Sequence, residues 1–203
     1  WDRLVEIFRK PSLQMVSFTI TEKGYSVSPA DLERGAEPQL IMGKVTALLY
    51  ERYQAGALPI TVQSMDNCSH NGDKVRSAAM AYAETWVKAG LVPQDFLEYL
   101  KDESKVSFPW SMIDKITPRP DAKVQKMLEE DGFEDLVIED QYTNGRPPLE
   151  QGGVLYADRE TVDKVEKMKV CTCLNPLHTA MSIYGCLLDY TLISAEMKDE
   201  DLC

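Results

Sequence analysis

The chain lacks any long apolar run, which limits the kinds of protein it can be. No stretch approaches the roughly 20 apolar residues that a membrane-spanning helix requires. No segment combines a basic start, an apolar middle and a small-residue cleavage site, as a signal peptide does. With 203 residues, 44% of them hydrophobic, the chain can still bury a sizeable core.

Cysteine and histidine are scarce and poorly arranged for disulfides or metal binding. The five cysteines are Cys68, Cys171, Cys173, Cys186 and Cys203. Their number is odd and no CxxC pair occurs, so we expect a reducing compartment and a cytoplasmic protein. Grouping Cys68 with His70, or Cys171 and Cys173 with His178, matches no standard zinc spacing, so we expect no metal.

Basic residues are outnumbered by acidic ones, 22 against 33, which gives a formal net charge of −11. A field of that sign argues against nucleic acid and anionic membranes as partners, although a local basic site can still bind a carboxylate substrate. The chain also contains no GxGxxG motif, no P-loop and no nucleophile elbow.

Strand-like and helical patterns alternate over the first two thirds of the chain. Residues 15–20 and 59–65 are rich in β-formers, whereas residues 40–53 carry apolar side chains at helical spacing. The last third has helical patterns only. We therefore expect an α/β fold that passes into an all-α region, with a boundary near Asp158.

Two asparagines are expected to cap helices. Asn71 would cap a helix that ends at Gly90, and Asn175 precedes Pro176, a pair typical of a helix start. The positive end of the second helix, together with desolvation, would lower the pKa of the nearby Lys169 toward the range of a general base.

Each of these clusters also has a plain structural interpretation. Asp66, Asn67 and Asn71 can simply turn and cap a strand–helix connection. Asn175 can be a cap and nothing more, with His178 in a polar contact and the lysine in water. The residues alone therefore predict an α/β chain with an Asn/Lys/His cluster and stop there.

Five segments, in order and over nearly the whole chain, resemble the mannitol dehydrogenase family of long-chain polyol dehydrogenases. They are TITEKGY (residues 19–25), SMDN…NG (64–72), FPWSMIDKITP (108–118), VIED…GRP (137–147) and LNPLHTA (174–180). The stretch VCTCLNPLHT (170–179) is similar to the branch that acts on mannonate and fructuronate.

The resemblance implies the later part of a Rossmann-like dinucleotide-binding domain at residues 1–158, followed by the start of an all-α substrate domain at 159–203. It implies NAD as cofactor, with NADP not excluded, and a small-molecule sugar acid or polyol as substrate. The expected reaction interconverts D-mannonate and D-fructuronate by hydride transfer. The glycine fingerprint that selects NAD or NADP is expected before Trp1 and a substrate-binding arginine after Cys203, so we expect an inactive internal fragment.

The same resemblance assigns the site residues. Lys169 would be the general acid/base, and Asn67 and Asn175 would donate hydrogen bonds to the developing alkoxide. Substrate would be oriented by His178 and Asp114. Protons would be relayed by Glu22 and Glu166.

One departure from the family pattern bears on the lysine. In that pattern the lysine precedes the asparagine by five positions, whereas Lys169 and Asn175 are six positions apart. Either a local bulge absorbs the extra residue, or the register moves Val170 into place; Lys167 is a less attractive substitute. The longer spacing favours a noncatalytic binding fragment as the rival hypothesis. A family member acting on tagaturonate or mannitol is the other.

Overall fold

The computed structural model describes residues 1–33, 38–113 and 136–199. The chain divides into two compact units, Trp1–Val162 and Asp163–Cys203. Asp114, one of the expected site residues, lies outside the described residues.

The first unit is built on a three-stranded parallel sheet in the order β1-β2-β3. The strands are β1 (Met15–Phe18), β2 (Ile60–Ser64) and β3 (Val106–Ser107). All five residues of the central strand β2 are buried, as expected for a parallel strand covered on both faces. The strands expected at residues 15–20 and 59–65 are thereby confirmed.

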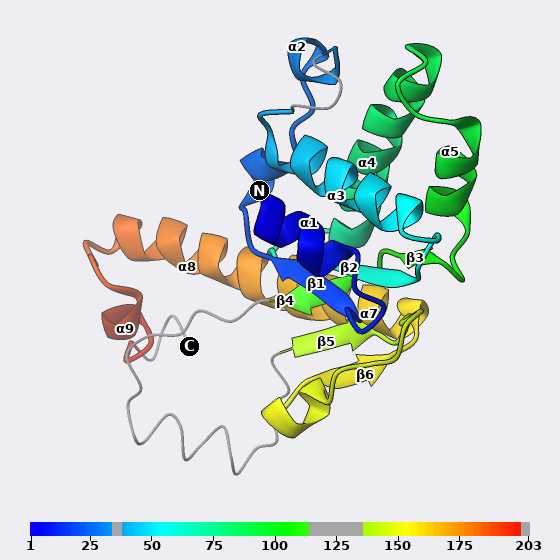
Figure 1. The fold of residues 1–203 in the computed structure, drawn as a ribbon. Helices are drawn as coiled ribbons and strands as arrows, with labels where there is room; N and C mark the ends of the chain where they lie inside the picture. Colours follow the sequence, from blue (N-terminus) through cyan, green and yellow to red (C-terminus); the bar gives the residue numbers. More distant parts are fainter. Residues whose placement is uncertain (34–37, 114–135, 200–203) are drawn as a thin grey trace. The chain divides into compact units, whose positions relative to one another are not determined.

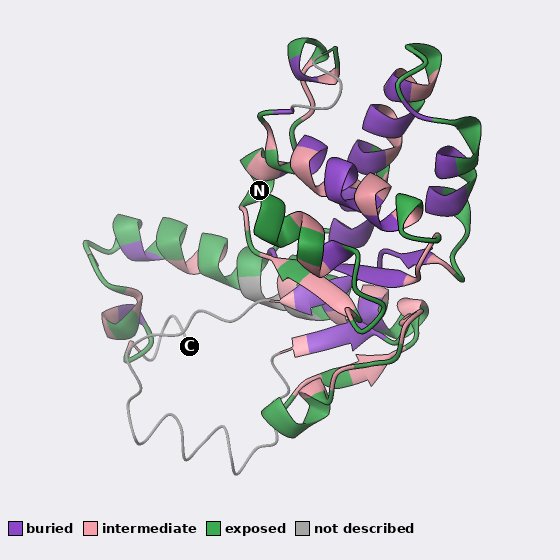
Figure 2. Ribbon diagram, in the orientation of Figure 1, coloured by how far each residue is buried: buried purple, intermediate pink, exposed green. Residues whose placement is uncertain are grey.

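Helices separate these strands along the chain (Figure 1). Preceding β1 is α1 (Asp2–Phe8), and between β1 and β2 lie η1 (Glu22–Tyr25), α2 (Pro29–Leu32) and α3 (Ile41–Gln54). Between β2 and β3 lie α4 (Asn71–Lys88) and α5 (Gln94–Lys101). Their apolar faces pack with the sheet into one core, in which Leu49, Val62, Tyr82 and Phe96 are fully buried (Figure 2). The alternation confirms the α/β prediction.

A second small sheet follows in the same unit. It contains β4 (Ser111–Ile113), β5 (Leu136–Glu139) and β6 (Leu155–Ala157), with η2 (Leu149–Gly152) before the last strand. Strand β5 is antiparallel to β4 and parallel to β6. Pro109 stands between β3 and β4, which belong to different sheets. Proline has no N–H to donate to a ladder, so it is compatible with this break between the two strands.

The described part of the second unit is helical. Helix α7 (Arg159–Glu166) begins in the first unit and continues without a break through the π-helix η3 (Lys167–Leu174) into α8 (Asn175–Leu187). Helix α9 (Ile193–Glu196) follows. The predicted N-cap at Asn175 is wrong: this residue is helical, with φ −65° and ψ −45°, and its N–H donates to the Val170 carbonyl. Because helix charge gathers at free termini, the dipole argument for a lowered lysine pKa fails with it.

Candidate active site at the carboxyl edge of the sheet

The loops that leave β1 and β2 are joined by one buried carboxylate. Asp66, 5% exposed, accepts hydrogen bonds from the backbone N–H of Ile20 at 2.9 and 3.0 Å and of Thr21 at 2.7 Å. It also accepts one from the Tyr25 hydroxyl at 2.5 Å. Burial, followed by this bond to Asp66, raises the pKa of Tyr25. The segment TITEKGY is thus held against the end of the neighbouring strand.

Asn71 joins the second loop to the third. Its side chain is fully buried, and its amide nitrogen donates to the Asp66 carbonyl at 3.0 Å and the Ser111 hydroxyl at 2.8 Å. Its amide oxygen accepts from the Ser111 N–H at 3.0 Å, and the Ser111 hydroxyl donates to the Ser64 carbonyl at 2.7 Å. The predicted N-cap role is wrong, because the N-cap is His70 and the Asn71 amide is used between loops instead.

Gly72 is required by the close approach of the third loop. A Cβ on Gly72 would lie 2.3 Å from the Phe108 carbonyl oxygen and 2.7 Å from that of Pro109. Both are backbone atoms, which cannot swing aside. The Asn-Gly pair therefore lets the segment beginning FPW pass directly against the first turn of α4.

Trp110 is held in a stack beside these loops. The His70 ring lies parallel to it, with centroids 4.0 Å apart, and the Arg159 guanidinium carbon lies 4.7 Å from its centroid. Arg159 also donates to Glu139 at 2.9 Å, and the second oxygen of Glu139 accepts from the backbone N–H of Trp110 at 3.0 Å. Nothing in the sequence pattern indicated this arrangement, since its members lie far apart along the chain.

Two of the expected site residues lie at this edge of the first unit. Asn67 follows the buried Asp66 directly and is itself exposed. Glu22 lies in η1 with its side chain 80% exposed, and its carboxylate is 3.4 Å from the Lys74 amine. Both residues belong to the segments that follow the carboxyl ends of parallel strands. Open α/β sheets bind ligands at these ends. A groove of about 450 Å³ is lined there by Glu22, Tyr25, Ser26, Val27, Lys74, Ser77 and Ala78.

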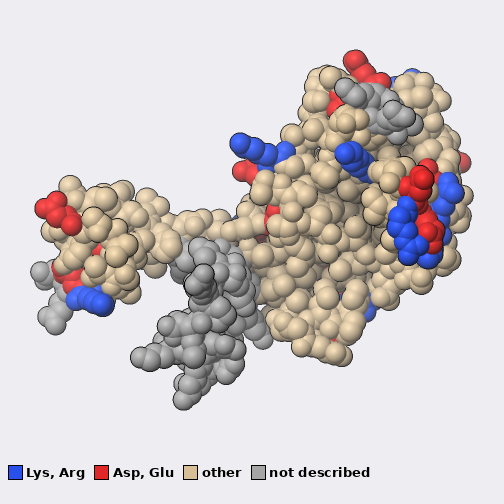
Figure 3. All heavy atoms as spheres, turned by 60° about the vertical axis from the view of Figure 1, so that its left-hand side comes forward, with Lys and Arg blue, Asp and Glu red and all other residues tan. Residues whose placement is uncertain are grey.

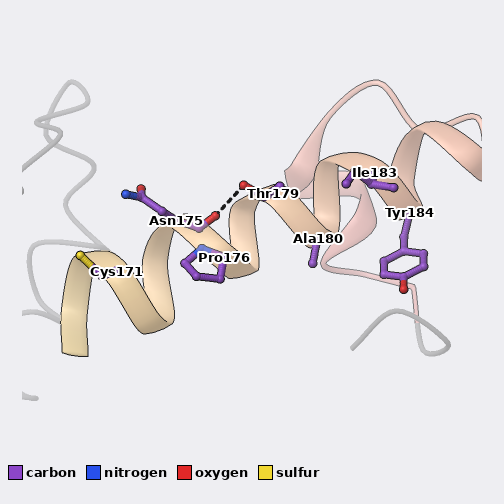
Figure 4. A pocket seen from close by; sticks show the side chains of 7 residues that line it. All are labelled: Cys171, Asn175, Pro176, Thr179, Ala180, Ile183 and Tyr184. Atoms are coloured by element: carbon purple, nitrogen blue, oxygen red, sulfur yellow. Dashed lines mark hydrogen bonds between the residues drawn. The ribbon is translucent and has the colours of Figure 1, made fainter. Parts of the chain in front are cut away.

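The other expected residues lie on the continuous helix of the second unit. Glu166 is buried, at 8% exposed, whereas Asn175 and His178 are exposed on successive turns of α8. Lys169 lies in the π-helix η3. The Asn175 amide points outward from the helix beside a groove of about 660 Å³ (Figure 4). The groove is lined by Cys171, Asn175, Pro176, Thr179, Ala180, Ile183 and Tyr184.

The described residues show no gathering of three His, Cys, Asp or Glu side chains that could hold a metal ion. Cys171 and Cys186 are free thiols. No helix in the described ranges has both the length and the apolar character needed to cross a bilayer. In the view of Figure 3, basic and acidic atoms lie side by side in mixed groups, with no broad basic patch on that face.

Comparison with known proteins identifies the family of this chain. Residues 2–151 match the model of the mannitol dehydrogenase Rossmann domain, so the chain belongs to the mannitol dehydrogenase family, as the five motifs indicated. Among its relatives is D-mannonate oxidoreductase of Thermotoga maritima, 49% identical over 98% of this chain and 43% of that protein. Another is polyol:NADP oxidoreductase of Gluconobacter oxydans, 31% identical over 95% of this chain and 42% of that protein.

Two solved structures share the fold. Substrate-free D-sorbitol dehydrogenase superposes with a TM-score of 0.75 at 28% identity, covering 99% of this chain and 44% of that one. Mannitol 2-dehydrogenase of Pseudomonas fluorescens, in a ternary complex with NAD and D-mannitol, gives 0.65 at 32% identity, covering 93% of this chain and 41% of that one. The chain thus spans less than half the length of these relatives.

Proposed function

We propose that the protein carrying this chain is a cytoplasmic NAD(P)-dependent oxidoreductase that interconverts D-mannonate and D-fructuronate. The observation that carries the proposal is the 49% identity to a D-mannonate oxidoreductase, against 31% to a polyol:NADP oxidoreductase over a similar share of the chain. In this proposal residues 1–158 belong to the dinucleotide-binding domain and residues 159–203 begin the substrate domain.

The residues of the first unit fit a dinucleotide. Three loops at the carboxyl ends of parallel strands are tied together by Asp66 and Asn71, which leaves the polar, exposed Asn67 on a rigid edge. The loops at residues 19–25 and 65–70 would hold the nicotinamide half. When bound, NAD(P) supplies the hydride acceptor for oxidation and the hydride donor for reduction.

Lys169 would act as general acid/base in both directions. As a neutral amine it would take the hydroxyl proton of the sugar acid during oxidation, and as an ammonium it would return a proton to the carbonyl oxygen during reduction. Asn67 and Asn175 would donate hydrogen bonds to the alkoxide that forms in between. Preorganised donors of this kind are typically worth about 3 kcal/mol each.

Four further residues would support this chemistry. His178 and Asp114 would orient the substrate, and the exposure of His178 on α8 supports such a contact. Glu166 and Glu22 would relay protons. The burial of Glu166 supports proton exchange with a defined partner. The exposure of Glu22 beside Lys74 supports proton exchange with solvent.

The test compares substrates and variants in a protein of the relatives' full length. We expect fructuronate to be reduced with NADH in strong preference to tagaturonate and fructose. We expect Lys169→Ala to lose about 10²- to 10⁴-fold in kcat, the usual contribution of a positioned acid or base. Lys167→Ala is the matched control, because this exposed lysine pairs with Asp163 at 2.6 Å, and its kcat should stay near wild type.

Each result has a distinct meaning. Preference for tagaturonate or fructose would make the substrate assignment wrong while leaving the class intact. A Lys169→Ala variant with wild-type kcat would show that another group carries the proton. No turnover of any of the three substrates with either NADH or NADPH would favour the noncatalytic rival.

A further inference from the structure

The helix that carries Lys169 and Asn175 changes register between them. In its α-helical part, the hydroxyls of Thr179 and Ser182 each donate to the carbonyl four residues earlier, at 2.8 Å. The Thr172 hydroxyl instead donates to the Lys167 carbonyl, five residues earlier, also at 2.8 Å. The backbone agrees, since the Asn175 N–H donates to Val170, again five residues earlier. Side chain and main chain therefore report the same π register.

The sequence contains a physical reason for this wider turn. Pro176 follows directly, inside a continuous helix. In an α-helix its ring would clash with the carbonyl four residues earlier, that of Thr172, and its missing N–H would leave an acceptor unpaired. Widening the preceding turn relieves the clash. In this wider register the hydroxyl of Thr172 bonds to the Lys167 carbonyl, five residues back.

The register determines where Lys169 lies around the helix relative to Asn175. Five α-helical steps of about 100° turn the chain by about 500°. Six π-helical steps of roughly 80° turn it by about 480°, which is nearly the same direction. Six α-helical steps would turn it by about 600° and displace one residue by about 100° around the axis from the other. The π turn thus absorbs the extra residue without rotating the pair.

We propose that η3 sets the angular relation between Lys169 and Asn175, and that Thr172 is the positioning residue that holds it. The inference rests on the proposed function, in which these two residues serve one proton transfer. In addition, this proton transfer requires the π register of the helix, which the exposed hydroxyl of Thr172 holds.

The test uses variants of the full-length protein with fructuronate and NADH. Thr172→Val keeps the shape of the side chain and removes the donor, and we expect kcat to fall about five- to tenfold, as loss of one hydrogen bond permits, with KM within about twofold because the site is still assembled. Thr172→Ser keeps the hydroxyl and should restore kcat. Thr85→Val removes an equivalent hydroxyl, bonded to Ala81 at 2.9 Å in α4, and should leave kcat unchanged.

Two changes of chain length test the geometry directly. Deleting Cys173 leaves the lysine and the asparagine five positions apart, so an α-helix then gives the same direction and kcat should stay within about tenfold of wild type. Inserting one alanine after Thr172 rotates the pair apart and should reduce kcat as far as Lys169→Ala does. Circular dichroism and the thermal midpoint of each variant report whether it folds.

The outcomes separate this inference from the proposed function. If Lys169→Ala is inactive while Thr172→Val has wild-type kcat, the positioning role is overturned and the proposed function stands. If Thr172→Val is impaired but Thr172→Ser does not restore it, the hydroxyl is not the cause and the inference fails. A folded Cys173 deletion as inactive as Lys169→Ala would overturn the angular argument. The Thr172 pair alters no chain length and decides the matter where a deletion does not fold.

Discussion

The strongest structural prediction concerns Asp66, whose carboxylate holds the first two loops of the site together. Asp66→Asn keeps the size of the side chain but replaces one acceptor oxygen with a donor. The donors facing it are the N–H groups of Ile20 and Thr21 and the hydroxyl of Tyr25. The new amide nitrogen can face the Tyr25 hydroxyl, which can turn to accept from it, and the two N–H groups would bond to a neutral oxygen.

The expected magnitude follows from those contacts. A hydrogen bond to a charged group contributes about 1.5–3 kcal/mol, against about 0.5–1.5 kcal/mol for one between neutral groups, so each of the three bonds should lose about 1 kcal/mol. Asp66→Asn should therefore lower the free energy of opening residues 19–25 by about 3 kcal/mol. Asp95→Asn is the matched control, because this exposed aspartate in the first turn of α5 should change stability by less than about 1 kcal/mol.

Amide hydrogen exchange under native conditions measures this directly. A change of 3 kcal/mol corresponds to roughly 100-fold faster exchange at Ile20, Thr21 and the amides of η1, with no comparable change in α5. Exchange at these amides within about threefold of wild type would refute the reasoning, since the carboxylate would then not be what fixes the loop.

The remaining predictions concern a glycine and the tyrosines. Gly72→Ala places a Cβ 2.3 Å from a backbone oxygen, so we expect it to lower the thermal midpoint by several degrees. Gly152→Ala is the control, because open space surrounds that position and its thermal midpoint should not fall. Equal midpoints for the two variants would contradict the close approach at Gly72. Burial raises the pKa of four tyrosine hydroxyls well above the ordinary value, so the stability they contribute is present below about pH 10 and is lost as the pH rises above it. Phenolate absorbance from them should therefore appear together with unfolding, and ionisation near pH 10 in a protein that stays folded would contradict this. The four are Tyr25, Tyr82, Tyr99 and Tyr142.

Much of the fold was predictable from local patterns. The β-rich stretch at residues 59–65 became β2, and the helical periodicity at residues 40–53 became α3, within one or two residues. These assignments succeed because each segment has to bury its own apolar face. The spacing of its apolar residues therefore shows the period of the helix or strand. The family was also predictable, because the order of five motifs can be read from the sequence without knowing which residues are in contact.

The candidate site was less accessible to such reasoning. Its segments were identified, yet the parts played by Asp66 and Asn71 were not, because most of their partners are 40 or more positions away along the chain. Local rules predicted that Asn71 caps a helix. Its buried amide instead makes hydrogen bonds that connect three loops, and these bonds satisfy more buried polar groups than one cap would. The stack of His70, Trp110 and Arg159 was missed for the same reason.

The helix start expected at Asn175 shows the division most clearly. By itself the sequence indicated a helix after Asn175, a helix start at the Asn-Pro pair, and one residue more than the family pattern between Lys169 and Asn175. Only the tertiary structure decided that the helix does not start there and that the turn before Pro176 is widened instead. The Asn-Pro pair is compatible with both outcomes, and the choice depends on whether the preceding residues are held in a helix by packing, which no local pattern records.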